Sequence, residues 1–278
     1  MLSIIFISHT EKTTIIIGGL SSDDIAVTSV EYFGPLDITI PRLSALIRIK
    51  TAAYVDGILY GCGRQRNYIE ACFKYELAAD SGSWDLFMTI PFSTMFSNAV
   101  AIDDFFWYFS DKIIQVPVHG NNVISYGWSL GSQGCAVGNG SHTVIIQNYN
   151  SSVLINKDPS SPYHWTTAVV LNTAVSACGC LWLDNTIYVT GGMVINDRTN
   201  LTQLINTNTF TVTLGAALPV SLAYHGMGVI DGRPAVIGGI MNKGASSAIF
   251  VFDSSANTWS LSEESLSAEL SYFASVTF

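Results

Sequence analysis

Charged side chains are scarce in this chain of 278 residues. Asp, Glu, Lys and Arg together make up 12% of it, about half the share that is usual in globular proteins. Residues 113–156 and 199–230 contain no charged residue. The formal net charge is -9, whereas nucleic acid and anionic membrane surfaces attract basic faces. We therefore expect neither nucleic acid nor a membrane among the partners.

The chain also lacks long apolar runs. Gly, Asn and Pro interrupt both uncharged stretches, so neither contains the roughly 18 consecutive apolar residues of a membrane-spanning helix. The N-terminal sequence MLSIIFISHTEK has no basic region, and its apolar segment is too short for a secretory signal. These absences favour a cytoplasmic protein. The low charge and three N-x-S/T sequons, at Asn139, Asn150 and Asn200, keep an extracellular location as the alternative.

Cysteine pairs with metal-ligand spacing are absent. The five cysteines form no C-x-x-C pair, and their odd number leaves at least one thiol free. They are Cys62, Cys72, Cys135, Cys178 and Cys180. We expect buried, reduced thiols, which agrees with a reducing compartment.

Motifs of common catalytic sites are missing as well. The chain has no G-x-S-x-G, no P-loop and no dinucleotide-binding fingerprint. Its five histidines show no H-x-H, H-x-x-H or H-E-x-x-H spacing. We predict no catalytic residue, no metal site and no cofactor, and we expect that the protein is not an enzyme.

A repeat with a period near 44 residues is present. Four copies consist of an apolar strand that ends in a glycine pair or its remnant: TTIIIGG, ILYGCG, TIYVTGG and PAVIGG. Two degenerate copies, FFWYFSD and HTVIIQN, lie between the second and third of these. The second-last residues of the six copies are Gly18, Cys62, Ser110, Gln147, Gly191 and Gly238. Because these are 44, 48, 37, 44 and 47 positions apart, the chain is predicted to be a repeat protein.

Each repeat predicts four short strands. A first strand ends in a tight turn such as the Asp-Gly of AAYVDG, and the glycine strand follows. A third strand, such as SAIFVFD, and a fourth strand marked by Trp complete the unit. A small antiparallel sheet of this kind has two apolar faces, which radial stacking buries. We predict one all-β domain over residues 1–278, a six-bladed β-propeller with four-stranded antiparallel blades.

The repeat resembles the kelch repeat. The double glycines Gly18–Gly19, Gly191–Gly192 and Gly238–Gly239 match the family's glycine pair. Tyr188 and the Asp253, Asn257 and Trp259 ending match other family positions. The resemblance is weak in units three and four, where Ser110–Asp111 and Gln147–Asn148 replace the glycines. It implies the propeller of the kelch-like and galactose oxidase central-domain superfamily.

The chain has few Lys and Arg residues, and several of them follow glycine strands. In this repeat such positions are loops between second and third strands, which gather on one rim of a propeller. We predict a partner-binding rim there, with Arg64 and Arg66 as contacts to a partner carboxylate. The set is Asp23, Asp24, Arg64, Arg66, Tyr68, Asn196, Asp197, Arg198 and Lys243. The simpler alternative is that loops tolerate charge.

His225 has two interpretations. It opens the predicted first strand YHGMGVI, which places it near the mouth of the central channel. In the second interpretation, His225 is a hydrogen-bonded residue of the blade, which is the more common role for a single histidine.

The predicted function is a non-enzymatic module that binds a partner protein as a monomer, for substrate recognition or as a scaffold. One alternative from the resemblance is a carbohydrate-active propeller, similar to galactose oxidases or to a sialic acid isomerase. A second alternative is a structural fragment of a longer kelch protein.

The C-terminal sequence SYFASVTF matches the first strand of a unit, but no glycine strand follows it. We expect it to pair with Thr13–Gly19 and to close the ring. Met1–Ser8 competes for the same position.

Overall fold

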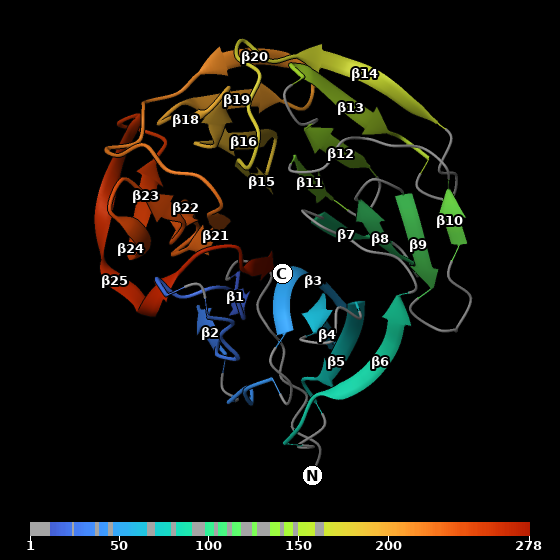
Figure 1. Cartoon of the computed structure of the whole chain (residues 1–278). Helices are drawn as coiled ribbons and strands as arrows, with labels where there is room; N and C mark the ends of the chain where they lie inside the picture. The colour runs from blue at the N-terminus through green and yellow to red at the C-terminus, as the bar shows by residue number, and fades with distance from the viewer. Residues whose placement is uncertain are drawn as a thin grey trace.

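The computed structural model describes residues 12–23, 25–36, 39–43, 47–65, 70–78, 82–90, 98–102, 105–109, 113–117, 124–126, 134–139, 142–146, 150–158 and 164–278. All regular elements in these ranges are β-strands. Figure 1 shows their sheets arranged around a central axis, which is the predicted β-propeller.

Three consecutive sheets have four antiparallel strands in chain order, from the innermost strand outward. The first consists of β3 (Ile47–Val55), β4 (Ile58–Gln65), β5 (Glu70–Glu76) and β6 (Asp85–Ile90). The second consists of β7 (Asn98–Ile102), β8 (Phe105–Phe109), β9 (Ile113–Pro117) and β10 (Ile124–Tyr126). The third consists of β11 (Cys135–Gly138), β12 (Thr143–Ile146), β13 (Ser152–Asn156) and β14 (Trp165–Val170).

Two further blades carry a short extra element after the glycine pair. One contains β15 (Gly179–Leu183), β16 (Thr186–Thr190), β19 (Thr202–Asn206) and β20 (Thr211–Leu214), with the hairpin β17 (Met193–Val194) and β18 (Asp197–Arg198) after β16. The other contains β21 (Gly226–Ile230), β22 (Arg233–Ile237), β24 (Gly244–Asp253) and β25 (Thr258–Leu270), and β23 (Ile240–Met241) pairs with β24.

The remaining sheet has three strands in the order β2 (Val30–Phe33), β1 (Thr14–Ile17) and β26 (Ala274–Thr277). The described residues thus form five sheets of four or more strands, instead of the six four-stranded blades that the repeat predicts. The chain after β2 includes residues 37, 38 and 44–46, outside the described ranges, and no fourth strand is assigned in the described part of it.

The C-terminal segment pairs with the strand that the sequence indicates. β26 runs antiparallel to β1, with Thr14 opposite Thr277 and Ile17 opposite Ala274. The phenyl ring of Phe278 stacks on Tyr54 of β3 with centroids 3.8 Å apart. The competing segment Met1–Ser8 lies outside the described residues, as do the degenerate positions Ser110–Asp111 and Gln147–Asn148.

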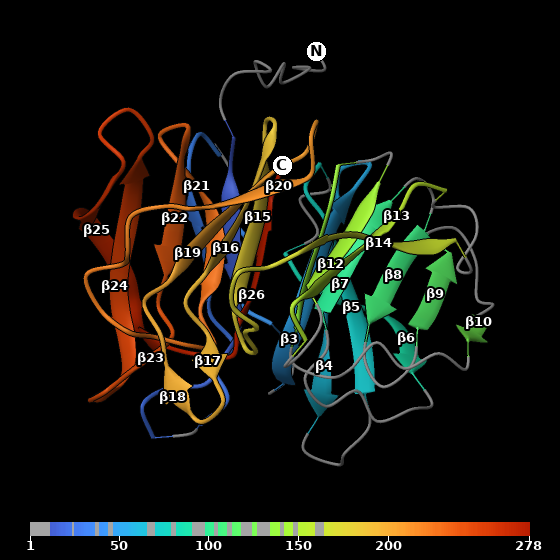
Figure 2. The same ribbon diagram turned by 90° about the horizontal axis from the view of Figure 1, so that it is seen from above.

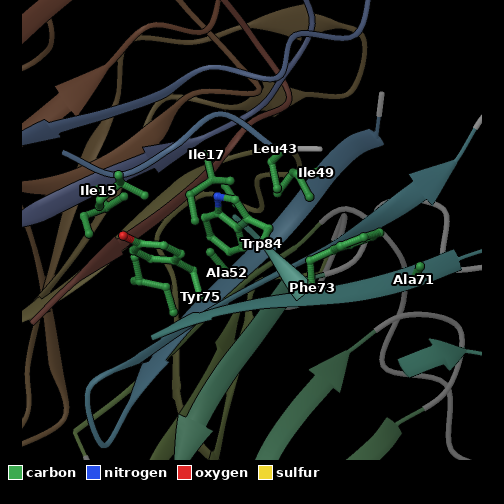
Figure 3. Close-up of a cluster of buried hydrophobic side chains, with 12 residues drawn as sticks. Ile15, Ile17, Leu43, Ile49, Ala52, Ala71, Phe73, Tyr75 and Trp84 are labelled. Atoms are coloured by element: carbon green, nitrogen blue, oxygen red, sulfur yellow. The ribbon is translucent and has the colours of Figure 1, made fainter. Parts of the chain in front are cut away.

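Two of the tryptophans that mark fourth strands fill the space between neighbouring sheets. Figure 3 shows Trp84 among Ile15 and Ile17 of β1 and Ile49 and Ala52 of β3. Trp259 packs in the same way between the last two blades, and its indole Nε1 donates to the carbonyl oxygen of Ala216 at 3.1 Å. Aromatic packing and a satisfied indole N–H together hold adjacent blades in place.

The glycine pairs join each blade to the next. Gly192 has φ +94°, and its N–H donates to the carbonyl oxygen of Leu222, in the connection to β21, at 2.8 Å. Gly239 has φ +93° and donates in the same way to Leu270 at 2.8 Å. A Cβ atom at Gly192 would lie 2.5 Å from the carbonyl oxygen of Ser176. Positive φ and this close approach both require glycine, which explains the motif.

Candidate functional site: the loop rim and the central channel

Three loops leave their glycine pairs at equivalent places on one face. Met193 pairs with Ser176, and its N–H donates to the Ser176 carbonyl oxygen at 2.7 Å. Ile240 pairs with Ala223, and Leu20 pairs with Ser271, through the same type of bridge. Figure 2 shows β17, β18 and β23 at one end of the molecule, with the C-terminus toward the other. We call the described residues of these three loops (20–23, 25–26, 193–198 and 240–244) the loop rim.

The structure places five of the predicted rim residues in the loop rim. Asp23, Asn196, Asp197 and Lys243 are exposed, and Arg198 is partly buried. Arg198 Nε is buried without a hydrogen-bond partner among the described residues.

Of the other four predicted rim residues, the structure describes the backbone of Arg64 alone. Arg64 lies in β4 with its backbone opposite Glu70, so it belongs to a strand and not to a loop, and its side chain is outside the described part. Asp24, Arg66 and Tyr68 lie outside the described residues altogether. The predicted pair of arginine contacts is therefore not placed by the structure.

Ile195 is a rim residue that the sequence analysis missed. It occupies the tip of the β17–β18 hairpin, with 76% of its surface exposed and φ +58°. A β-branched residue is rare in this left-handed conformation, which costs on the order of 1–3 kcal/mol. In the sequence, Ile195 reads as the continuation of an apolar strand, so no local signal marks it.

Two tyrosines lie where the connections between blades enter the channel. Tyr224 and Tyr272 have φ +57° and +52°, and their rings stack with centroids 4.1 Å apart. The N–H of Tyr224 donates to Ala177 O at 2.9 Å, and the N–H of Tyr272 donates to Tyr224 O at 3.1 Å. These bonds link successive blades around the axis at equivalent positions before β15, β21 and β26.

Two cavities lie between the innermost strands β3, β11, β15, β21 and β26. The smaller, of 90 Å³, lies at the start of these strands, beside the tyrosines. Its lining includes Cys135, Cys178, Cys180, His225 and Phe273. The larger, of 430 Å³, lies toward the ends of the same strands. Tyr54, Trp182, Asp184 and Lys12 are among its lining residues, so it carries both signs of charge.

His225 combines its two predicted roles. It lines the smaller cavity, and its Nε2 lies 2.9 Å from the hydroxyl of Thr190. Its Nδ1 is buried and has no partner among the described residues. Burial lowers the pKa of His225 to about 3, because a charged imidazolium would lose its hydration there. The ring is therefore neutral at physiological pH.

The expectation of reduced thiols is wrong for four of the five cysteines. Cys62 and Cys72, directly opposite each other on β4 and β5, form a disulfide. Cys135 and Cys180 form a second disulfide between β11 and β15. Cys178 is free and buried. Spacing along the chain did not indicate these pairs. The second pair in particular depends on which blades are neighbours.

The part of the chain that the structure describes contains no group of three or more His, Cys, Asp or Glu residues that could hold a metal ion. It also contains no helix long and apolar enough to cross a membrane.

No family model matches the chain, and no curated protein matches it. Among solved structures, the chain is similar to one described as "Structure of YjhT", with a TM-score of 0.71 and 12% sequence identity. The match covers 84% of this chain and 89% of that one. At this identity the likeness supports the β-propeller fold, and the kelch family stays a resemblance.

Proposed function

We propose that the protein is a non-enzymatic binding module that recognises a partner protein through the loop rim. The single observation that carries this proposal is Ile195, an apolar side chain with 76% of its surface exposed at the tip of a hairpin. Burying such a side chain in an interface contributes about 1.5–3 kcal/mol. The positive φ of Ile195 belongs to the two-residue turn between β17 and β18, so the proposal rests on the exposed side chain and not on the backbone.

Charged groups elsewhere on the loop rim suit the edge of an interface. Asp197 and Lys243 are exposed and of opposite sign, as in the polar border that surrounds an apolar contact. Arg198, which is partly buried in β18, adds a cationic side chain to the same hairpin. The glycine-pair bonds hold the hairpin against its neighbour, so little flexibility is lost on binding.

Capture of a partner with matched baits tests the proposal. The baits are the wild type, Ile195→Ser and Leu261→Ser; Leu261 is 65% exposed on the outer strand β25 and serves as the control. We expect one protein to be retained by the wild type and by Leu261→Ser, and to bind Ile195→Ser at least tenfold more weakly. Equal retention by all three baits would refute binding through the hairpin.

A carbohydrate-active propeller is the second candidate, because the 430 Å³ cavity has the size of a small-molecule site. A thermal-shift screen with sugars separates the two candidates. Stabilisation by a sugar that is lost in Trp182→Ala, a change in the cavity lining, favours the second candidate.

We also propose that the chain is a kelch-type propeller whose three-stranded sheet is its sixth blade, with β26 closing the ring. Innermost strands contact each other in the circuit β26, β3, β7, β11, β15, β21 and back to β26. Hydrogen bonds bridge the three-stranded sheet and the blade of β25: Glu31 of β2 accepts from the N–H and the hydroxyl of Ser267, both at 2.8 Å. These contacts support closure.

The two disulfides favour the extracellular alternative over the cytoplasm, because such bonds persist in oxidising compartments. Glycan attached to Asn139 or Asn150, both exposed, would support this assignment. Free Cys62 and Cys72 in protein taken directly from its source would contradict it.

A further inference from the structure

Three sulfur atoms from two neighbouring blades meet at the smaller channel cavity. Cys135 opens β11, while Cys178 and Cys180 stand immediately before and within β15. Cys135 is bonded to Cys180, and the free Sγ of Cys178 lies 3.4 Å from Sγ of Cys135. The thiol is thus in contact with one sulfur of the disulfide. All three residues line the same cavity, so they share one environment.

We propose that Cys178 exchanges with this disulfide, so that the free thiol moves to Cys180 and becomes a modification site in the central channel. In the exchange, the Cys178 thiolate attacks Sγ of Cys135 and forms the Cys135–Cys178 bond. The Cys135–Cys180 bond breaks, and its electron pair leaves with Sγ of Cys180, which takes up the proton that Cys178 released. One disulfide and one thiol are present before and after, so no oxidant or reductant is consumed.

The exchange changes what the free thiol can reach. Cys178 lines the smaller cavity of 90 Å³, whereas Cys180 lines both that cavity and the larger one of 430 Å³. Cys135 and Cys178 are 4% and 7% exposed, and Cys180 is partly exposed. A thiol at Cys180 therefore faces a space that a small, thiol-reactive molecule can enter. Before the exchange, the only free thiol among the five cysteines is a buried one.

The surroundings keep the exchange slow at neutral pH. Burial raises the pKa of the Cys178 thiol to about 12, so roughly 10⁻⁵ of it is thiolate at pH 7. His225 is the sole other titratable residue that lines the smaller cavity, and its pKa of about 3 leaves it neutral. The residues that β3, β11 and β26 contribute to this lining are uncharged. The exchange rate is expected to rise about tenfold for each pH unit between pH 7 and 9.

Differential alkylation of the full chain tests the proposal. Native protein is treated with N-ethylmaleimide, then reduced and treated with iodoacetamide, and peptide fragmentation at Gly179 distinguishes Cys178 from Cys180. We expect N-ethylmaleimide chiefly on Cys180, at a rate that rises about tenfold per pH unit. N-ethylmaleimide on Cys178 alone, or labelling of Cys180 at a rate independent of pH, would overturn the exchange.

Two variants make the result specific. Cys178→Ser removes the attacking thiol, so Cys180 should remain unlabelled; labelling there would show that its thiol arises by another route and would overturn the proposal. Cys180→Ser should form the Cys135–Cys178 disulfide under the conditions that form Cys62–Cys72. If Cys62–Cys72 forms while Cys135 and Cys178 both stay free, the two sulfurs cannot bond and the proposal fails.

Discussion

Thr14→Val tests whether the three-stranded sheet is bound to the blade that begins with β21. Thr14 is fully buried in β1, and its hydroxyl lies at β21, 215 positions away in the sequence. It donates to the carbonyl oxygen of Val229 and accepts from the N–H of Val229, both at 2.8 Å. It also lies 2.9 Å from the hydroxyl of Thr277 on β26. One hydroxyl thus connects the three strands.

The expected loss of stability follows from the polar groups that valine leaves without a hydrogen-bond partner. Valine has nearly the shape of threonine, so the substitution creates little cavity and isolates the polar contribution. In the variant, the N–H and C=O of Val229 lose their buried partner, at a cost of about 1–3 kcal/mol each. Part of this cost is offset, because valine has no hydroxyl group that must be removed from water on folding. We expect the free energy of unfolding to fall by about 2–4 kcal/mol.

Urea denaturation monitored by tryptophan fluorescence measures this change. A slope of about 3 kcal/mol/M places the midpoint about 1 M lower than in the wild type. Thr213→Val, on the exposed face of β20, is the matched control and should change stability by less than about 0.5 kcal/mol. If Thr14→Val differs from Thr213→Val by less than about 0.5 kcal/mol, the docking of β1 on β21 is refuted.

Three further predictions concern closure, pH and the glycine pairs. Deletion of Leu270–Phe278 removes β26 and should abolish cooperative unfolding; a stable monomer would contradict closure by this strand. Burial depresses the folded-state pKa of His225 from 6.5 to about 3, so its contribution to stability is full above pH 6.5. The free energy of unfolding then falls by about 1.4 kcal/mol per pH unit as the pH drops from 6.5 toward 3. His225→Gln should flatten that part of the stability profile in urea titrations. Gly192→Ala should lower the melting temperature far more than Gly232→Ala, because a Cβ at Gly232 meets nothing within 4 Å; equal shifts would show that contact with the neighbouring blade is unimportant.

Local backbone chemistry explains why much of the fold was predictable. The predicted turns at Asp56–Gly57 and Asp231–Gly232 adopt positive φ at both residues, as Asp-Gly pairs favour. The loops after the glycine pairs leave their blades through equivalent bridges, because both glycines of each pair adopt positive φ. The blade count differs from the prediction because the sheet that contains TTIIIGG has three strands among the described residues, one of them from the other end of the chain.

The candidate site was predicted in outline only. The sequence indicated the loop rim and Asn196, Asp197, Arg198 and Lys243 on it, since their positions follow from the repeat. It did not indicate Ile195, whose exposure depends on the hairpin protruding beyond the sheets. Whether these residues bind a partner stays a prediction.

The sequence by itself determined the period, the strand order within blades and the positions of the turns, because each depends on residues close together in the chain. Only the tertiary structure decided that Cys135 bonds to Cys180, that Tyr224 stacks on Tyr272 and that Thr14 bonds to Val229. Each of these contacts joins different sheets. The physical reason is that such contacts depend on which sheets become neighbours around the axis, and radial packing sets that arrangement for the whole molecule.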